Sequence, residues 1–280
     1  DAVDPTILRT ARSNLHQGVG ALELVGLSAA AQLLRASENA VTKLTTRTNR
    51  LTPAACDLIE RSSFGLLDYL ARMLAGKPVS PVALFPQYQD VQTMAGADRV
   101  HPADLWPHDW RWRDVAPTNI PGRHADEAMQ SLIESSTLSL MRQPGGPAAL
   151  ELSHLYSALA NAVIADGRDR RLASLWQLGA GFFEALGHKL LAPDVFTKRV
   201  ASRLMAQMRM SERGGVDGAP VAEVSERLAQ DLLFFCAQAG QPRVEINAQR
   251  LAAVRQAWGV THSVQVNYAS SSLGRYDPTW

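Results

Sequence analysis

Prolines and glycines divide this chain into segments of helical length. Asp4-Pro5 and Thr52-Pro53 each place a capping side chain directly before a proline, which is typical of the first turn of an α-helix. Gly26 and Gly76 follow apolar runs, at positions where helices commonly end. Between these marks, apolar residues recur every three or four positions, which is the period of an α-helix. The spacing predicts a mainly α protein.

Three helices are expected before residue 77, and their connections are short. Short connections favour antiparallel neighbours, so we expect an antiparallel helical bundle. The apolar positions that indicate the three helices are, in order, Leu8, Ala11, Leu15, Val19, Leu22 and Gly26; Ala31, Leu34, Ala40 and Leu44; and Leu58, Phe64, Leu67, Leu70 and Leu74.

The segment 77–122 interrupts this pattern with seven prolines and the run WPHDWRW. A short helix is expected over 86–94, and the remainder is expected to be an irregular covering loop. We therefore predict a first domain, 1–115, that combines the bundle with a Pro/Trp-rich loop.

The second half returns to the helical period. We expect a second helical lobe over 122–260, followed by a short extended tail, 261–280, in which Ser263–Tyr268 alternates polar and apolar residues. The helices of the lobe are predicted at 124–142, 147–166, 169–190, 193–211, 220–239 and 248–258.

Composition and charge restrict the class of partner. Apolar residues make up 46% of the chain, which supports a packed core, and the net charge of +1 gives no reason to expect nucleic acid. No run is long and apolar enough to predict membrane insertion. Cys56 and Cys236 form no metal or redox motif, so we expect buried thiols in a reducing cytoplasm. Because the chain begins with Asp1 rather than Met, we expect it to be part of a longer protein.

One row of the first helix combines basic residues, a histidine and a glycine. It is offset from the apolar stripe, so it is predicted to face solvent. Glycine inside a helix costs about 1 kcal/mol relative to alanine, and one use of that cost is to let a partner approach the histidine closely. The alternative is that the glycines allow close helix packing and the histidine is an ordinary surface residue; the residues alone favour this alternative. The candidate docking residues are Arg9, Arg12, His16, Gln17, Gly20 and Glu23.

Other candidate sites are weak. The Trp106–Trp112 segment carries His and Asp side chains whose spacing matches no standard metal site, so its tryptophans are expected to hold the loop onto the helices. No G-x-S-x-G or G-x-x-x-x-G-K motif occurs, and no carboxylate pair stands out. We therefore expect no metal, no cofactor and no enzyme activity in these 280 residues.

The first helix resembles that of histidine phosphotransfer (Hpt) domains. His16, Gly20 and Val25-Gly26 occupy positions that match a phosphoaccepting histidine, the glycine four residues later and the later hydrophobic-Gly pair. The family has lysine three residues after the histidine, where this chain has Val19. The resemblance implies a degenerate Hpt-like domain, with His16 as the candidate phosphoacceptor.

A second resemblance covers most of the chain. The ordered landmarks LHQGVGALELVGL, LLDYLARMLAG, ALFPQYQDV, DRVHPADLW and LGRYDPTW are similar to the N-terminal region of ChpA/PilL-type hybrid chemotaxis kinases, which are CheA-like proteins of type IV pilus systems, and to the FimL scaffold. This implies a non-catalytic interaction module in the control of twitching motility. Its implied partners are a response regulator receiver domain or a polar scaffold protein, and its implied location is the cytoplasm with recruitment to the cell pole.

Two other functions stay open at this point. In the first, His16 is an active phosphotransfer nucleophile, with Arg9 or Arg12 replacing the missing lysine. In the second, the chain senses a small molecule in a pocket between its lobes. The sequence predicts neither the partner nor the oligomeric state.

Overall fold

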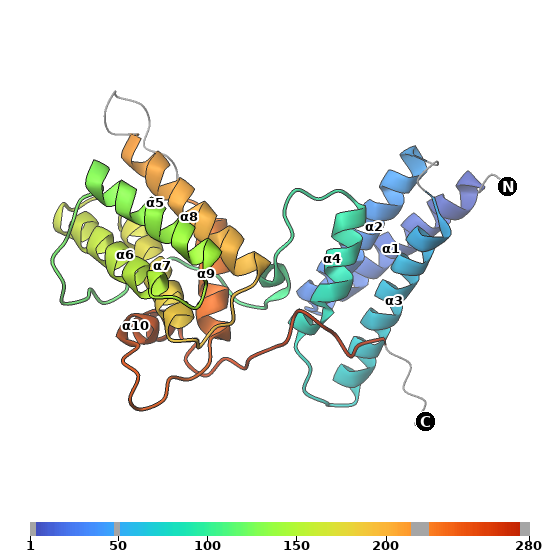
Figure 1. Ribbon diagram of the computed structural model, residues 1–280. Helices are drawn as coiled ribbons and strands as arrows, with labels where there is room; N and C mark the ends of the chain where they lie inside the picture. The colour runs from blue at the N-terminus through green and yellow to red at the C-terminus, as the bar shows by residue number, and fades with distance from the viewer. Residues whose placement is uncertain (1–3, 48–50, 214–223, 275–280) are drawn as a thin grey trace. The chain divides into compact units, whose positions relative to one another are not determined.

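The protein is helical throughout the described residues of this computed structural model (Figure 1). The described residues contain ten α-helices and no β-strand, which confirms the prediction of a mainly α fold. The structure describes residues 4–47, 51–213 and 224–274.

The chain divides into two compact units. One unit contains residues 1–109 together with 266–280, and the other contains residues 110–265. The end of the Trp-rich segment therefore groups with the second unit, and the tail from Val266 groups with the first. The domain boundaries expected from the sequence, at 115, 122 and 260, stay a prediction.

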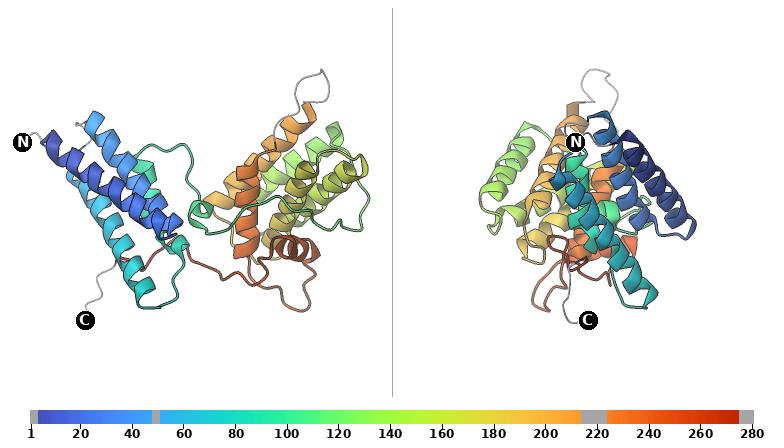
Figure 2. Two further views of the ribbon diagram at one scale, coloured as in Figure 1. Left: turned by 180° about the vertical axis from the view of Figure 1, so that it is seen from behind. Right: turned by 90° about the vertical axis from the view of Figure 1, so that its right-hand side faces the viewer.

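The first unit is built around an antiparallel pair of helices. Helices α1 and α2 lie side by side along their length, and α2 also contacts α3 and α4 (Figures 1 and 2). Its core is formed mainly by α2, α4 and the two 3-10 turns. The elements are α1 (Pro5–Leu24), α2 (Ser28–Thr46), α3 (Pro53–Leu74), η2 (Pro81–Leu84), α4 (Phe85–Met94) and η3 (Pro102–Leu105).

Helix ends in this unit follow the predicted signals. An Asp4 carboxylate oxygen accepts a hydrogen bond from the Thr6 N–H at 2.8 Å, and the Thr52 hydroxyl caps α3 in the same way. Gly26 has φ +77°, a conformation that glycine adopts without strain. The Leu27 N–H then returns to the Leu22 carbonyl at 2.9 Å, which closes the last turn of α1.

Helix α3 does not bury the face that its leucines suggest. Phe64, Leu67 and Leu74 are 53%, 60% and 91% exposed, although their spacing made them inward candidates. Apolar residues occur around most of this helix, so the period alone does not select the buried face. Three of its five buried residues are small, which lets neighbouring elements approach closely. The residues that α3 buries are Ala55, Ser62, Gly65, Leu66 and Tyr69.

The second unit surrounds one helix, α7, that is buried along most of its length. Every residue of α7 from Leu172 to Leu186 is buried, and α7 contacts α6, α9 and α10. Helix α6 is long and apolar enough to cross a membrane by length and composition, but 67% of it is buried inside the unit, and a core helix passes the same test. The helices are α5 (Glu127–Arg142), α6 (Ala148–Ala165), α7 (Arg170–Gly187), α8 (Val195–Arg213), α9 (Glu226–Gln238) and α10 (Gln249–Trp258).

An irregular segment, residues 110–122, is fixed to the second unit by its backbone. We call it the strap. Four side chains from α6, α7 and α10 donate hydrogen bonds to its carbonyl oxygens, so they hold the strap largely independently of its side chains. The donors and acceptors are Trp258 Nε1 to Arg111 O (2.8 Å), Ser174 Oγ to Arg113 O (2.8 Å), Gln177 Nε2 to Val115 O (3.0 Å), and Asn161 Nδ2 to Thr118 O (3.0 Å) and Ile120 O (2.8 Å).

Tryptophan packing agrees with the predicted role of the loop. The Trp110 ring stacks on Trp258 of α10 with the ring centroids 5.7 Å apart, and Trp112 meets the edge of Trp110.

The tail also packs rather than forming a strand. Tyr268 contacts Phe85 edge-on at 6.1 Å, and Leu273 is buried.

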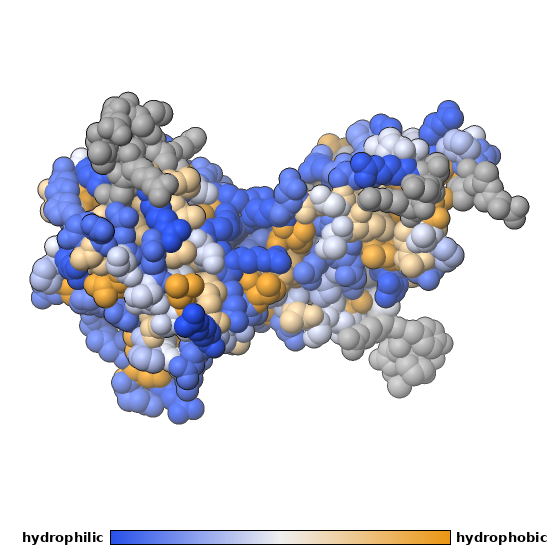
Figure 3. Space-filling model, turned by 45° about the horizontal axis from the view of Figure 1, so that its top comes forward, coloured by the Kyte–Doolittle hydropathy of each residue, from blue (hydrophilic) through white to orange (hydrophobic). Residues whose placement is uncertain are grey.

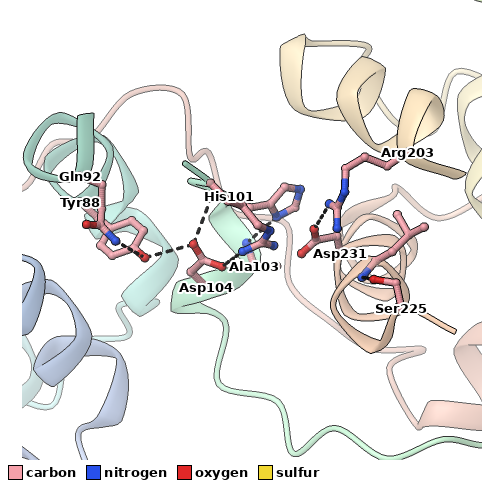
Figure 4. A network of polar contacts seen from close by, with 10 residues as sticks. Tyr88, Gln92, His101, Ala103, Asp104, Arg203, Ser225 and Asp231 are labelled. Atoms are coloured by element: carbon pink, nitrogen blue, oxygen red, sulfur yellow. Dashed lines mark hydrogen bonds and ion pairs between the residues drawn. The ribbon is translucent and has the colours of Figure 1, made fainter. Parts of the chain in front are cut away.

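Buried charged groups in both units are paired (Figure 4). In the first unit, Asp104 accepts hydrogen bonds from Tyr88 Oη at 3.1 Å and from Arg99 at 2.6 Å. In the second unit, the fully buried Asp231 accepts from Arg203 at 2.6 Å. A buried charge is stable only with such partners, so these pairs hold the helices and loops that supply them together.

The pH dependence of stability is expected to involve Glu184 of α7. Burial raises the pKa of this carboxyl group, while the Leu251 N–H, which donates to Glu184 at 2.7 Å, opposes the shift. The folded state therefore keeps the proton to a higher pH than the unfolded state does. The free energy of unfolding should fall as pH rises from the ordinary glutamate range through the raised pKa.

The substitution Glu184→Gln removes the titration and keeps an acceptor for Leu251. We expect the variant to lose less stability than the parent between about pH 4 and about pH 7. Urea unfolding followed by circular dichroism measures this difference. Equal pH slopes for the two proteins would show that Glu184 does not contribute.

Candidate docking face on the first helix

The row predicted on the first helix is exposed in the structure. We call it the α1 face. The side chain of His16 is 76% exposed, whereas Leu8 and Val19 of the apolar stripe are buried. The stripe packs against α2, and the α1 face lies to one side of that apolar contact. The exposed members are Arg9, Arg12, His16, Gln17, Gly20 and Glu23.

Two ion pairs join the α1 face to α2. His16 Nδ1 lies 3.1 Å from a carboxylate oxygen of Glu38, and Glu23 pairs with Arg35. A carboxylate at Nδ1 favours the tautomer with the proton on that nitrogen, which leaves a lone pair on Nε2. The contact also holds the imidazole in one orientation although the ring is solvent-exposed.

The two glycines of α1 have different roles. A Cβ atom at Gly18 would lie 2.6 Å from Leu34 Cδ2, so Gly18 allows the close approach of α1 and α2. A Cβ atom at Gly20 would have nothing within 4 Å. Packing inside this chain therefore explains Gly18 and does not explain Gly20, which leaves open space one turn after His16.

Val19 occupies the position where Hpt domains have lysine, and it is only 5% exposed. This position faces the interior, so a lysine here would have to bury its ammonium group against α2. The structure does not bring Arg9 or Arg12 into a hydrogen bond or ion pair with any other described residue. The α1 face thus has cations near its histidine, but none at the position of the Hpt lysine.

His101, close to the Trp-rich segment, has a structural role. His101 Nδ1 accepts from the Ala103 N–H at 3.1 Å and caps η3 (Figure 4). Within residues 4–47, 51–213 and 224–274, no group of three or more His, Cys, Asp or Glu side chains could hold a metal ion.

The prediction that both thiols are buried was wrong for Cys56, which is exposed on the first turn of α3; Cys236 is buried in α9.

Comparison with known proteins identifies the second half of the chain. Residues 122–271, more than half of the chain, match the family model described as the FimL scaffold protein second domain. The chain belongs to the FimL scaffold protein family. No curated protein and no solved structure matches this FimL family member.

The family match gives the coarse function. It indicates a scaffold role in type IV pilus chemotaxis signalling, which is a role of binding rather than of catalysis. The matched residues cover the second unit from residue 122 onward and part of the tail, and they do not include α1. Membership in the FimL family therefore supports protein partners in general and leaves the α1 face to be argued from its own geometry.

Proposed function

We propose that this FimL family member docks a response regulator receiver domain or a polar scaffold protein through the α1 face, without catalysing a reaction. The observation that carries the proposal is the open space at Gly20 beside an exposed, oriented histidine. A helix accepts an interior glycine at a cost of about 1 kcal/mol, and no atom of the described residues lies within 4 Å of the position that a Cβ atom of Gly20 would take.

Charge on the α1 face suggests the chemistry of the partner. Arg9 and Arg12 lie on the same side of the helix as His16, whereas the one carboxylate of the row, Glu23, is already paired with Arg35. A partner surface that presents carboxylates or a phosphoryl group would complement these cations. We place this interaction in the cytoplasm, with the cell pole as the site of recruitment.

Binding assays with purified proteins test the proposal. The chain is immobilised and presented with the receiver domains of the response regulators and with the polar scaffold proteins of the same pilus system. We expect at least one of these to be retained, with affinity that falls as salt is raised, because charge on the α1 face contributes. Failure of all of them to bind would contradict the proposal.

The substitution Gly20→Trp should block docking and leave the fold intact. The indole would fill the open space beside His16, so the partner should bind at least about fivefold more weakly, as expected for a steric clash at an interface. Stability should stay within about 0.5 kcal/mol, because the site is exposed. The matched control is Ile7→Trp, because Ile7 is 63% exposed on the opposite side of the same helix, nine residues before His16. Equal affinity for both variants would count against the α1 face.

Active phosphotransfer is the second candidate, and the contact between His16 and Glu38 favours it. With Nδ1 held by a carboxylate, Nε2 has the lone pair that a phosphoryl group requires. Incubation with the cognate kinase core and radiolabelled ATP distinguishes the two functions. Acid-labile label that disappears in His16→Gln would establish phosphotransfer. Absence of label, with partner binding retained, supports the scaffold.

A further inference from the structure

A cavity of about 650 Å³ lies in the first unit, away from the α1 face. It is bordered by the last turns of α2, the first turns of α3 and the end of α4. Its volume falls in the range of roughly 300–1,000 Å³ that is typical of small-molecule sites. The residues around it are Ala40, Lys43, Leu44, Thr46, Arg47, Thr52, Ala54, Ala55, Leu58, Met94, Ala95 and Gly96.

Small residues leave this space open. Alanines stand on all three helices of the cavity, at Ala40, Ala55 and Ala95, and each is less than a tenth exposed. Leu44 and Leu58 add larger apolar surface to the wall. The wall can therefore bury an apolar molecule of moderate size by the hydrophobic effect.

The rim of the cavity is cationic. It carries Lys43 and Arg47, and none of the described residues around the cavity is acidic. The Lys43 ammonium donates to the Ala95 carbonyl at the end of α4, which occupies one of its three N–H groups. The Arg47 guanidinium makes no hydrogen bond or ion pair with any described residue, so it is available to an anion.

One helix terminus adds to this charge. Helix α3 directs its N-terminus, the positive end of its dipole, toward the cavity through Thr52, Ala54 and Ala55. At the end of α2, the Lys43 carbonyl oxygen already accepts hydrogen bonds from the Arg47 N–H and the Thr46 hydroxyl.

We propose that this cavity binds a small amphipathic carboxylate, with its apolar chain against the alanine and leucine wall and its carboxylate at Arg47 and Lys43. This site goes beyond the scaffold role and shares no residue with the α1 face. It provides a site on unit 1 through which a metabolite could bind independently of a protein partner. Figure 3 shows that hydrophobic residues reach the surface of the unit among polar ones.

Calorimetric titration of the full chain with decanoate tests the site. We expect one decanoate to bind per protein molecule. Uncharged 1-decanol should bind more weakly and acetate should not bind, because both the alkyl chain and the carboxylate of decanoate contribute to affinity. Arg47→Gln should weaken decanoate binding about fivefold, the effect expected for an exposed ion pair. The matched control Arg61→Gln, an exposed arginine of α3 outside the cavity, should leave the affinity unchanged.

Filling the cavity provides the second test. Ala55→Phe should abolish decanoate binding. If circular dichroism shows that this variant folds poorly, Ala54→Trp at the exposed rim replaces it and should also abolish binding. Absence of decanoate binding to the parent would overturn the proposal. So would unchanged affinity in the folded filling variant, or equal affinity for decanoate and 1-decanol.

Discussion

Replacing Arg255 with methionine is expected to lower the free energy of unfolding of the second unit by about 3 kcal/mol. Arg255 is only 4% exposed. Its guanidinium donates to the carbonyl oxygen of Cys236 at 2.8 Å, to that of Ala239, and to that of Gly240 at 3.3 Å. These acceptors lie in the last turn of α9 and just after it. Methionine fills part of the volume but leaves the buried carbonyls without donors.

Urea unfolding measured by circular dichroism tests this prediction. Arg142→Met is the matched control, because Arg142 is exposed in the last turn of α5, and its replacement should cost less than about 0.5 kcal/mol. Arg255→Lys should fall between them, since one ammonium cannot reach all the carbonyls in the same geometry. An effect of Arg255→Met no larger than that of Arg142→Met would show that this capping is unimportant.

Gly122→Val should destabilise the second unit by about 2–3 kcal/mol. A Cβ atom at this position would lie 2.8 Å from the Ala162 backbone nitrogen and 3.1 Å from the Asn161 carbonyl carbon. Both are helix backbone atoms, which cannot rotate away as a side chain would. The strap must therefore lift from α6, which weakens the hydrogen bonds from Asn161 to Thr118 and Ile120.

Gly145→Val is the control for this substitution. A Cβ atom at Gly145 would have nothing within 4 Å, so the same change in residue type meets open space. Urea unfolding followed by tryptophan fluorescence reports on the strap, because Trp110 and Trp112 lie in it. Similar midpoints for the two variants would mean that the strap tolerates displacement from α6.

Helix positions could be predicted because their signals are local. The proline and glycine marks placed the short helix near 86–94, and the structure has α4 at Phe85–Met94. The last helix, expected at 248–258, is α10 at Gln249–Trp258. Capping and chain reversal depend on a few neighbouring residues, so the sequence contains the information directly.

Helix faces and pockets could not be predicted in the same way, since they depend on the packing partner. The leucines of α3 did not reveal that Phe64 and Leu67 are exposed. The sequence also could not separate Gly18 from Gly20, because the difference lies in the position of Leu34 on α2. No motif marks the carboxylate cavity, whose alanines come from three helices.

Site-specific photo-cross-linking tests the central claim, docking through the α1 face, most directly. A benzophenone amino acid is placed at Gln17, within the α1 face, or at Ile7, which is 63% exposed on the opposite side of the same helix, nine residues before His16. Each protein is irradiated with the purified receiver domain or polar scaffold protein that the binding assay retains. The account predicts a covalent adduct from position 17 and little from position 7. Adducts of equal yield from both positions, or none from position 17 while binding is retained, would contradict it.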